Sequence, residues 1–463
     1  MKYVSTAILG IAMLRFLCGF VYAEETMISV PEKEWEQVRA DLAAIQESLK
    51  TEKEKADAKK KAEEEKKRTS PKTTWSGRFY FDGAASHLND DGEAILGDET
   101  NGTRFRTARL GVKGSLYDMI EYELEVDFTG SSLGAKNVFA GLKNLPCGVD
   151  VRLGHFKEPW SLENLSSSTR SVMIERSVLN GTKDICGGRN NGLMLHNWHT
   201  ADRWTWAVGG FAASMPEAFT SVDMRHHLAA TARVTFLPFY TECPNGSRYL
   251  WHLGASYSTR CYNRENAAAY KTSFRTGADS AIAQSMMDSG VLDGLDSLNA
   301  FLVESTWIRG PLSVDFEQAF FWMDDVYAGD ATVQSGYAQV SYFLTGESRN
   351  YQKKGGYFGL VEPNNPFVRT CKEGVGFFSG PGAWEIAYRC AWIDSGELVC
   401  THYDTASVQM GKTVNHVWGV NWYWNKNCRW MFNYVLANTD YEGRYAGKHG
   451  REQVWEARVQ VVF

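Results

Sequence analysis

The sequence predicts an all-β protein, a 16-stranded antiparallel transmembrane β-barrel that follows a short N-terminal helical coiled-coil segment. Apolar and polar residues alternate from Trp75 to Phe463, which is the pattern of strands with two different faces. Most of the alternating segments have the nine to thirteen or so residues that a tilted strand needs to cross a bilayer. Short turns and long loops alternate between them, as in outer-membrane barrels.

The composition fits one large sheet. A length of 463 residues would suggest about three domains, but a closed barrel uses hundreds of residues in a single sheet. Aromatic residues make up 13% of the chain, which suits a barrel with aromatic girdles. The net charge is −6. No basic patch interleaved with aromatic residues stands out, so we do not expect nucleic-acid binding.

Residues 1–23 have the features of a secretory signal peptide. Lys2 gives the positive start, and the mostly apolar stretch from Thr6 to Phe20 is interrupted by Arg15. Val21-Tyr22-Ala23 then provides the small-residue cleavage pattern. We therefore expect export of the mature chain.

Residues 24–70 predict a periplasmic helix with coiled-coil character and a charged linker. Five apolar residues repeat at 3-4-3-4 spacing, the a and d positions of two heptads, namely Trp35, Val38, Leu42, Ile45 and Leu49. The seam then turns polar, and the Lys/Glu run from Thr51 to Arg68 leads to a linker at Pro71. Two heptads are too few to associate alone, so an unassociated tether stays an alternative.

Residues 71–463 are predicted to form the barrel. Its sixteen strands are expected at 75–83, 103–115, 119–129, 136–143, 148–156, 190–198, 203–213, 225–237, 248–261, 300–309, 312–323, 332–345, 383–394, 412–424, 428–439 and 452–463. A soluble sandwich shows the same alternation. The even number of strands, their length and the terminal Phe463 favour the membrane barrel. Only the long 346–382 link falls on the side of the short turns.

The segment at about 157–189 is predicted to fold back into the barrel and narrow it. Lys157-Glu158-Pro159 ends the fifth strand, and a polar stretch with Ser166, Ser167 and Ser168 comes next. An ordinary surface loop is the alternative. Its place after a lumen-lining strand, on the side of the long loops, favours the constriction.

Strand parity directs several cations into the lumen: Arg78, Arg109, Lys113, Arg152, Arg225 and Arg233. Guanidinium groups offer forked donors to phosphate oxygens, although every water-filled barrel needs a polar interior. The tight turn at Tyr117 is expected to place Lys113 opposite Glu121 and Arg109 opposite Glu125. Glu123 and Asp127 would then lack a cation, and Arg78 and Arg152 would lack an acid.

The chain shows no catalytic motif such as G-x-S-x-G or H-E-x-x-H. We expect no enzymatic activity, no cofactor and no metal, because cysteines and histidines have no metal-ligand spacing. Cys390 and Cys400 flank the end of a predicted hairpin and form the most plausible disulfide. The other cysteines are equally well explained as free thiols.

The chain resembles the phosphate-selective porins O and P from about Trp75 to Phe463. The matching residues, in order, are Phe105-Arg106-Thr107-Ala108-Arg109-Leu110-Gly111, Phe156-Lys157-Glu158-Pro159-Trp160-Ser161-Leu162-Glu163, Glu175-Arg176, Gly382-Ala383-Trp384-Glu385 and Gly419-Val420-Asn421-Trp422-Tyr423. The resemblance implies a trimeric barrel of the bacterial outer membrane whose third outer loop constricts the passage. It also implies that the 346–382 link lies on the periplasmic side.

The resemblance implies an anion site formed by Arg78, Arg106, Arg152, Ser167, Ser168 and Arg176. Thr107 stands where the family has a second arginine, and Asn164 stands where phosphate-specific members have a lysine. Strict parity would turn Arg106 outward if Arg109 faces inward, unless a bulge intervenes.

From these observations we expect a homotrimeric porin in outer-membrane lipid that passes small anions, phosphate or polyphosphate, by passive diffusion. A general diffusion pore with little selectivity is one alternative. An outer-membrane structural tether acting through the N-terminal helix is the other.

Overall fold

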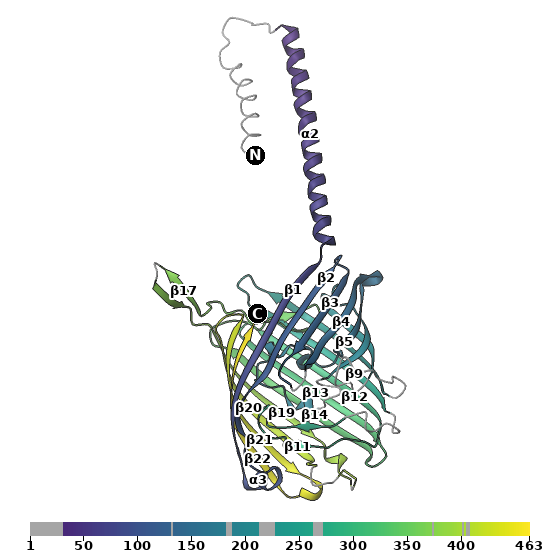
Figure 1. Ribbon diagram of the computed structural model, residues 1–463, viewed down its shortest axis with the longest axis vertical. Coiled ribbons are helices and arrows are strands. Elements are labelled where there is room, and N and C mark those ends of the chain that lie inside the picture. The colour runs from purple at the N-terminus through teal and green to yellow at the C-terminus, as the bar shows by residue number, and fades with distance from the viewer. Residues whose placement is uncertain are drawn as a thin grey trace. The chain divides into compact units, whose positions relative to one another are not determined.

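The computed structural model describes residues 31–130, 133–181, 188–212, 227–262, 272–372, 375–400, 402–403 and 408–463. The chain divides after Ser70 into an N-terminal unit and a unit of residues 71–463 (Figure 1). The signal peptide predicted at residues 1–23 lies outside the described residues, as does Arg225.

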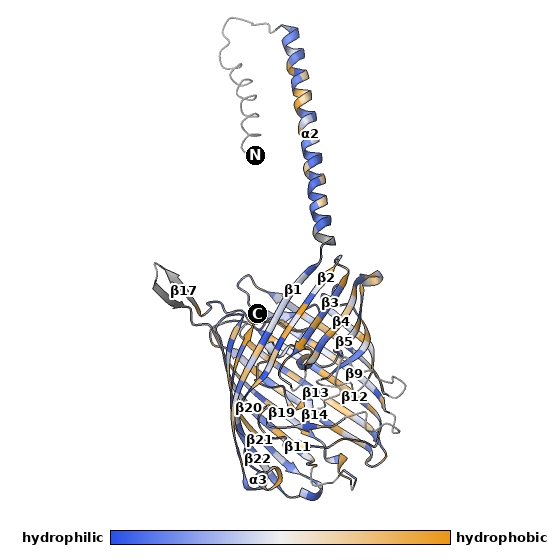
Figure 2. Ribbon diagram, in the orientation of Figure 1, coloured by the Kyte–Doolittle hydropathy of each residue, from blue (hydrophilic) through white to orange (hydrophobic). Residues whose placement is uncertain are grey.

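The N-terminal unit contains one long helix, α2 (Glu32–Thr69). Glu32 and Glu34 lie in its first turn, where carboxylates interact favourably with the helix dipole. The predicted apolar row from Trp35 to Leu49 is about half exposed along its whole length, and most of the remaining helix surface is hydrophilic (Figure 2). None of the described helices is long and apolar enough to cross a membrane.

The second unit is a closed antiparallel barrel of sixteen strands, as predicted. The strands follow one another in chain order, and β22 pairs with β1 to close the sheet. They are β1 (Lys72–Leu88), β2 (Asn101–Leu116), β3 (Ile120–Asp127), β4 (Gly134–Leu145), β5 (Val149–Lys157), β6 (Arg189–His196), β7 (Trp204–Ala212), β8 (His227–Glu242), β9 (Arg248–Tyr262), β12 (Leu295–Arg309), β13 (Leu312–Asp325), β14 (Gly329–Phe343), β19 (Ala383–Asp394), β20 (Gly411–Tyr423), β21 (Cys428–Tyr441) and β22 (His449–Val462). Closure pairs every strand on both sides, which a sheet in lipid requires.

The connections carry the remaining elements. They are the helices α3 (Asp90–Leu96) and α4 (Leu162–Leu165), and the short strand pairs β10 (Arg275–Thr276) with β11 (Met287–Asp288), β15 (Tyr351–Gln352) with β16 (Tyr357–Phe358), and β17 (Val368–Lys372) with β18 (Val375–Ser379). Single 3-10 turns lie at Pro146–Gly148, Ser168–Arg170, Val178–Gly181, Gly396–Leu398 and Gly443–Tyr445.

Side chains alternate between the outer wall and the lumen. In β22, Trp455 is half exposed on the outer wall, whereas its neighbours Glu456 and Arg458 are buried inside. Figure 2 shows the same mixture of apolar and polar positions along the strands. β1 extends five residues beyond the predicted end because Ala84, Ala85 and Ser86, which have little strand propensity, pair with β22.

The register between β2 and β3 differs from the prediction by two residues. Leu116 pairs with Ile120 across a three-residue turn in which Tyr117 and Asp118 adopt positive φ values of 54° and 51°. Arg109 therefore lies opposite Asp127, and Lys113 opposite Glu123. The predicted cross-strand positions of Lys113 and Arg109 were wrong, although a shift of two keeps each side chain on its face. Arg109 still forms the expected ion pair with Glu125, at 3.4 Å.

A β-bulge in β2 resolves the orientation of Arg106. Tyr80 pairs with Thr107 and Phe81 pairs with Phe105, so Arg106 has no partner residue in β1. An extra residue in one strand changes the parity of the residues beyond it. Arg106 and Arg109 therefore both face the lumen, which strict alternation would forbid.

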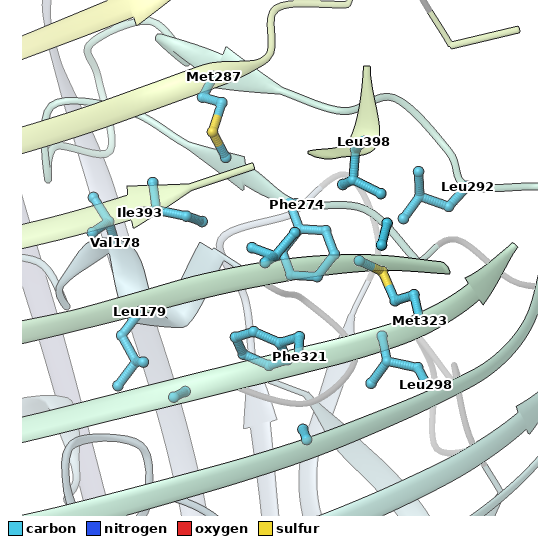
Figure 3. Close-up of a cluster of buried hydrophobic side chains, with 14 of the residues drawn as sticks. Val178, Leu179, Phe274, Met287, Leu292, Leu298, Phe321, Met323, Ile393 and Leu398 are labelled. Atoms are coloured by element: carbon cyan, nitrogen blue, oxygen red, sulfur yellow. The ribbon is translucent and has the colours of Figure 1, made fainter. Parts of the chain in front are cut away.

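Two long loops, rather than one, fold into the barrel. The described residues between β5 and β6 do so, where Asn421 and Arg429 donate to the carbonyls of Val172 and Ser171, and so do the described residues between β9 and β12. Phe274 from the second loop contacts Phe321 of β13 edge-to-face, with ring centroids 5.4 Å apart. Trp160 from the first loop lies against the same ring. Figure 3 shows the resulting lumen cluster, whose labelled members are Val178, Leu179, Phe274, Met287, Leu292, Leu298, Phe321, Met323, Ile393 and Leu398.

The lumen cluster fills the side of the barrel formed by β12, β13, β14 and β19. Cys390 and Cys400 are free rather than joined in a disulfide, contrary to the prediction, and they lie on opposite faces of the barrel wall. Cys400 packs against the lumen cluster. Cys390 lies between the inward residues Arg389 and Ala391 and faces the outer wall.

Candidate functional site

A cavity of about 700 Å³ lies in the lumen, against β1, β2, β3, β5, β22 and the loop after β5. All six residues of the predicted anion site line it: Arg78, Arg106, Arg152, Ser167, Ser168 and Arg176. Eleven lysine and arginine residues contribute to its lining, against four glutamates. We refer to it as the cationic cavity.

Arg78 and the two predicted serines connect β1 to the constriction loop. Arg78 donates to Ser167 Oγ at 2.8 Å and forms an ion pair with Glu125. The hydroxyl of Tyr80 lies 3.1 Å from Ser168 Oγ. These contacts hold the serine-containing turn against the first strand.

Arg106 shares a carboxylate with an arginine that the sequence did not single out. Its Nε and Nη2 donate to the two oxygens of Glu175 at 2.9 and 3.1 Å. Arg458 Nη2 donates to the same carboxylate at 2.7 Å and also binds the buried Asp82. Burial alone would raise the pKa of Glu175, but the charges of Arg106 and Arg458 lower this pKa to about 2.

Arg152 is also paired. It donates to Glu121 Oε1 at 2.8 and 3.2 Å, and its guanidinium lies 4.1 Å from the centre of the Phe139 ring. The expectation that Arg78 and Arg152 lack an acidic partner was therefore wrong. On the neighbouring strands, Arg109 binds Asp127 at 2.8 Å, and Glu123 accepts a hydrogen bond from Asn137 at 2.7 Å.

Arg176 binds carbonyl oxygens instead of a carboxylate. It donates to the carbonyls of Glu163, Asn164 and Ser166 at 3.2, 3.4 and 3.0 Å, near the C-terminal end of α4. Its burial lowers the pKa of Arg176, although Glu163 and Glu175 partly oppose this shift. Its position is thus set by the dipoles of the loop backbone.

Sequence reasoning missed further cations of the cavity, among them Lys157, Arg170 and Arg189. Lys157 Nζ donates to the carbonyls of Asn164 and Ser166. It therefore places an ammonium group beside Asn164, whose own side chain is buried. Parity cannot be read at a strand end, so only the unusual Lys157-Glu158-Pro159 break could have drawn attention to it.

Glu163 anchors the constriction loop. Its carboxylate accepts from the Ser177 hydroxyl at 2.7 Å and from Asn180 at 2.6 Å. Arg389 of β19 forms an ion pair with the same Glu163 carboxylate at 3.2 Å. It also forms an ion pair with Asp279 of the second in-folded loop, at 2.7 Å. A single buried guanidinium therefore holds both loops.

The Asp279 contact predicts a measurable pH dependence of stability. Burial raises the pKa of Asp279 from its ordinary value of 3.8 to about 6, against the opposing effects of Arg389 and Asn415. Between these values the folded state binds the proton more tightly than the unfolded state. Stability is therefore lost as the pH rises from about 4 to about 6.

In urea titrations of the refolded barrel, we expect the unfolding free energy of the wild type, relative to Asp279→Asn, to fall by about 2 to 3 kcal/mol between pH 4 and pH 7. The comparison cancels the other titrating groups. Parallel pH profiles of the two proteins would contradict the assignment.

Known proteins provide an independent comparison. The model of the family described as phosphate-selective porin O and P matches residues 85–463. Porin O of Pseudomonas aeruginosa is 25% identical over 372 residues, which cover 74% of this chain and 78% of that protein. An uncharacterized protein of Caulobacter vibrioides is 23% identical over 372 residues, covering 78% of this chain and 68% of that protein.

Among solved structures, OmpF of Salmonella typhi in complex with daunomycin has a TM-score of 0.50 at 12% identity. The match covers 84% of this chain and 97% of that one. This likeness shows the same barrel fold.

Proposed function

This chain belongs to the phosphate-selective porin O and P family, and on that premise we propose that it is an outer-membrane porin that selects small anions, with phosphate or polyphosphate as its main solutes. The supporting observation is the cationic cavity, where lysine and arginine residues outnumber glutamates by eleven to four. A lumen of one sign concentrates counter-ions and repels co-ions. Solutes would pass by diffusion, with no catalytic step.

Ion substitution tests the anion preference. In planar bilayers, replacing chloride by a bulky organic anion should lower the single-channel conductance more than replacing potassium by a bulky organic cation. Inorganic phosphate should block the chloride current at low concentration if the cavity binds it. A larger effect of cation replacement would overturn the proposal.

A general diffusion pore is the second candidate, and the ion pairs of the cavity favour it. Arg78, Arg106 and Arg152 each contact a carboxylate, so part of the cationic excess is neutralised. Equal effects of anion and cation replacement, without phosphate block, would support the general pore.

We further propose that three copies associate, with α2 in the periplasm. The evenly spaced apolar row of α2 is about half exposed in a single chain, and three helices in parallel would bury it as a and d positions. Three barrels that already associate would hold their helices at a high local concentration. This would compensate for the small number of heptads.

Deleting residues 24–70 distinguishes a channel formed by the barrel from a structural tether formed by α2. If conduction belongs to the barrel, the single-channel conductance of the deletion variant should equal that of the full chain. Detachment of the outer membrane in cells, with normal conductance, would support a structural role of α2. A lost conductance in correctly inserted barrels would contradict the assignment of conduction to residues 71–463.

A further inference from the structure

The cations of the cationic cavity fall into two groups that differ in their partners. Arg78, Arg106 and Arg152 form salt bridges with glutamates. Lys157, Arg176 and Arg189 form no salt bridge with any described residue. Their side chains donate to carbonyl and amide oxygens instead. The second group is therefore one source of uncompensated positive charge, beside Lys113, Arg170 and Lys426, which line the same cavity and form no salt bridge with a described residue.

These three cations converge on one place, although they come from different elements. Lys157 and Arg189 are directly opposite each other in the register of β5 and β6. Lys157 and Arg176 share the carbonyl oxygens of Asn164 and Ser166 as acceptors. A like-charge pair directly across two strands destabilises a sheet, so the cluster is costly unless an anion interacts with it.

The acids that are close enough to neutralise the cluster are already occupied. Glu163 accepts hydrogen bonds from Ser177, Asn180 and Arg389. Glu175 is held by Arg106 and Arg458, and Glu125 by Arg78 and Arg109. None of these carboxylates makes a salt bridge with Lys157, Arg176 or Arg189 in the described part of the chain.

The cluster also keeps donors available. Arg189 uses its Nε to bind Asn137 Oδ1 at 2.7 Å, and neither of its Nη groups donates to another atom of the described residues. Arg176 uses Nε and Nη2, which leaves Nη1. A planar fork of N–H donors matches two oxygens of one oxyanion, and an ammonium group adds a point charge.

We propose that Lys157, Arg176 and Arg189 together form the oxyanion-binding site of this porin, and that Arg78 and Arg106, which contact Ser167 and Glu175, serve mainly to hold the constriction loop. The ligand class is a small tetrahedral oxyanion, which can accept from an ammonium group and from two guanidinium forks at once. This inference rests on the proposed anion conduction and adds the residues that recognise the solute.

The test is phosphate block of the chloride current through the full-length protein in planar bilayers. Lys157→Gln and Arg189→Gln should each raise the phosphate concentration for half-block by about tenfold, the change expected for one lost charge-assisted hydrogen bond. Lys157→Arg, which keeps the charge, should restore most of the block. Lys143→Gln removes one charge from the end of β4, outside the lining of the cavity, and should leave the half-block concentration within about twofold.

Both substitutions to glutamine relieve repulsion between like charges, so folding should be preserved. Retention of the compact form in unheated gel electrophoresis checks this for each variant. Wild-type half-block concentrations in Lys157→Gln and Arg189→Gln would overturn the assigned site. A wild-type channel that prefers cations would instead overturn the proposed function, so the two failures are distinguishable.

Discussion

Replacing Arg458 by methionine is expected to lower the free energy of unfolding of the barrel by about 3 to 5 kcal/mol. Arg458 is buried and donates to both oxygens of Asp82, at 2.7 and 2.6 Å, and to Glu175 at 2.7 Å. Methionine fills much of the volume but leaves Asp82 as a buried charge without a cation among the described residues. Urea titration of the barrel refolded in lipid vesicles, followed by tryptophan fluorescence, measures the loss.

Arg451→Met in the same strand provides the control. Arg451 is exposed, and its side chain makes one hydrogen bond to the described residues, to Asn438 at 3.2 Å. Its replacement should therefore change the unfolding free energy by less than about 0.5 kcal/mol. If Arg458→Met costs no more than Arg451→Met, the buried ion-pair network does not hold the constriction loop to β1 and β22.

The second large effect concerns selectivity. Glu175→Gln is expected to raise the anion-to-cation permeability ratio by about threefold to tenfold, because it removes the charge that neutralises Arg106. The pKa of Glu175 is about 2, below its ordinary range despite burial, because Arg106 and Arg458 stabilise the carboxylate. The residue is therefore fully ionised at neutral pH, and the substitution deletes a whole charge.

Arg106→Gln is the matched opposite change and should lower the same ratio. Arg458 still contacts Glu175 in that variant, so the loop keeps one of its two attachments. Permeability ratios come from bi-ionic potentials of each variant. Shifts in the same direction for both substitutions would show that they act by moving the loop rather than through charge.

The sequence predicted the barrel well because its signal is repeated in every strand. Each of the sixteen predicted segments corresponds to one strand of the sheet, and errors of a few residues at strand ends do not change the fold. The β2–β3 register was wrong by two because the three-residue turn occupies residues 117–119, one position later than the predicted pairs require. The turn requires positive φ values at Tyr117 and Asp118, and these residue types do not predict such values.

The site was less accessible to sequence reasoning. Parity alone could not place Arg106, since a bulge is a local departure that leaves no periodic signal. Lys157 and Arg189 lie at strand ends, where the chain leaves the pleat and alternation stops being informative. The second in-folded loop was also missed, because its contact with Phe321 joins residues far apart in the chain.

The reversal potential of the wild-type channel in a potassium chloride gradient tests the anion-selective porin most directly. Because uncompensated cations of the cationic cavity attract chloride, we expect a reversal potential of the sign that marks anion selectivity, shifting toward zero in Lys157→Gln. A reversal potential of the opposite sign in the wild type would contradict the proposed function.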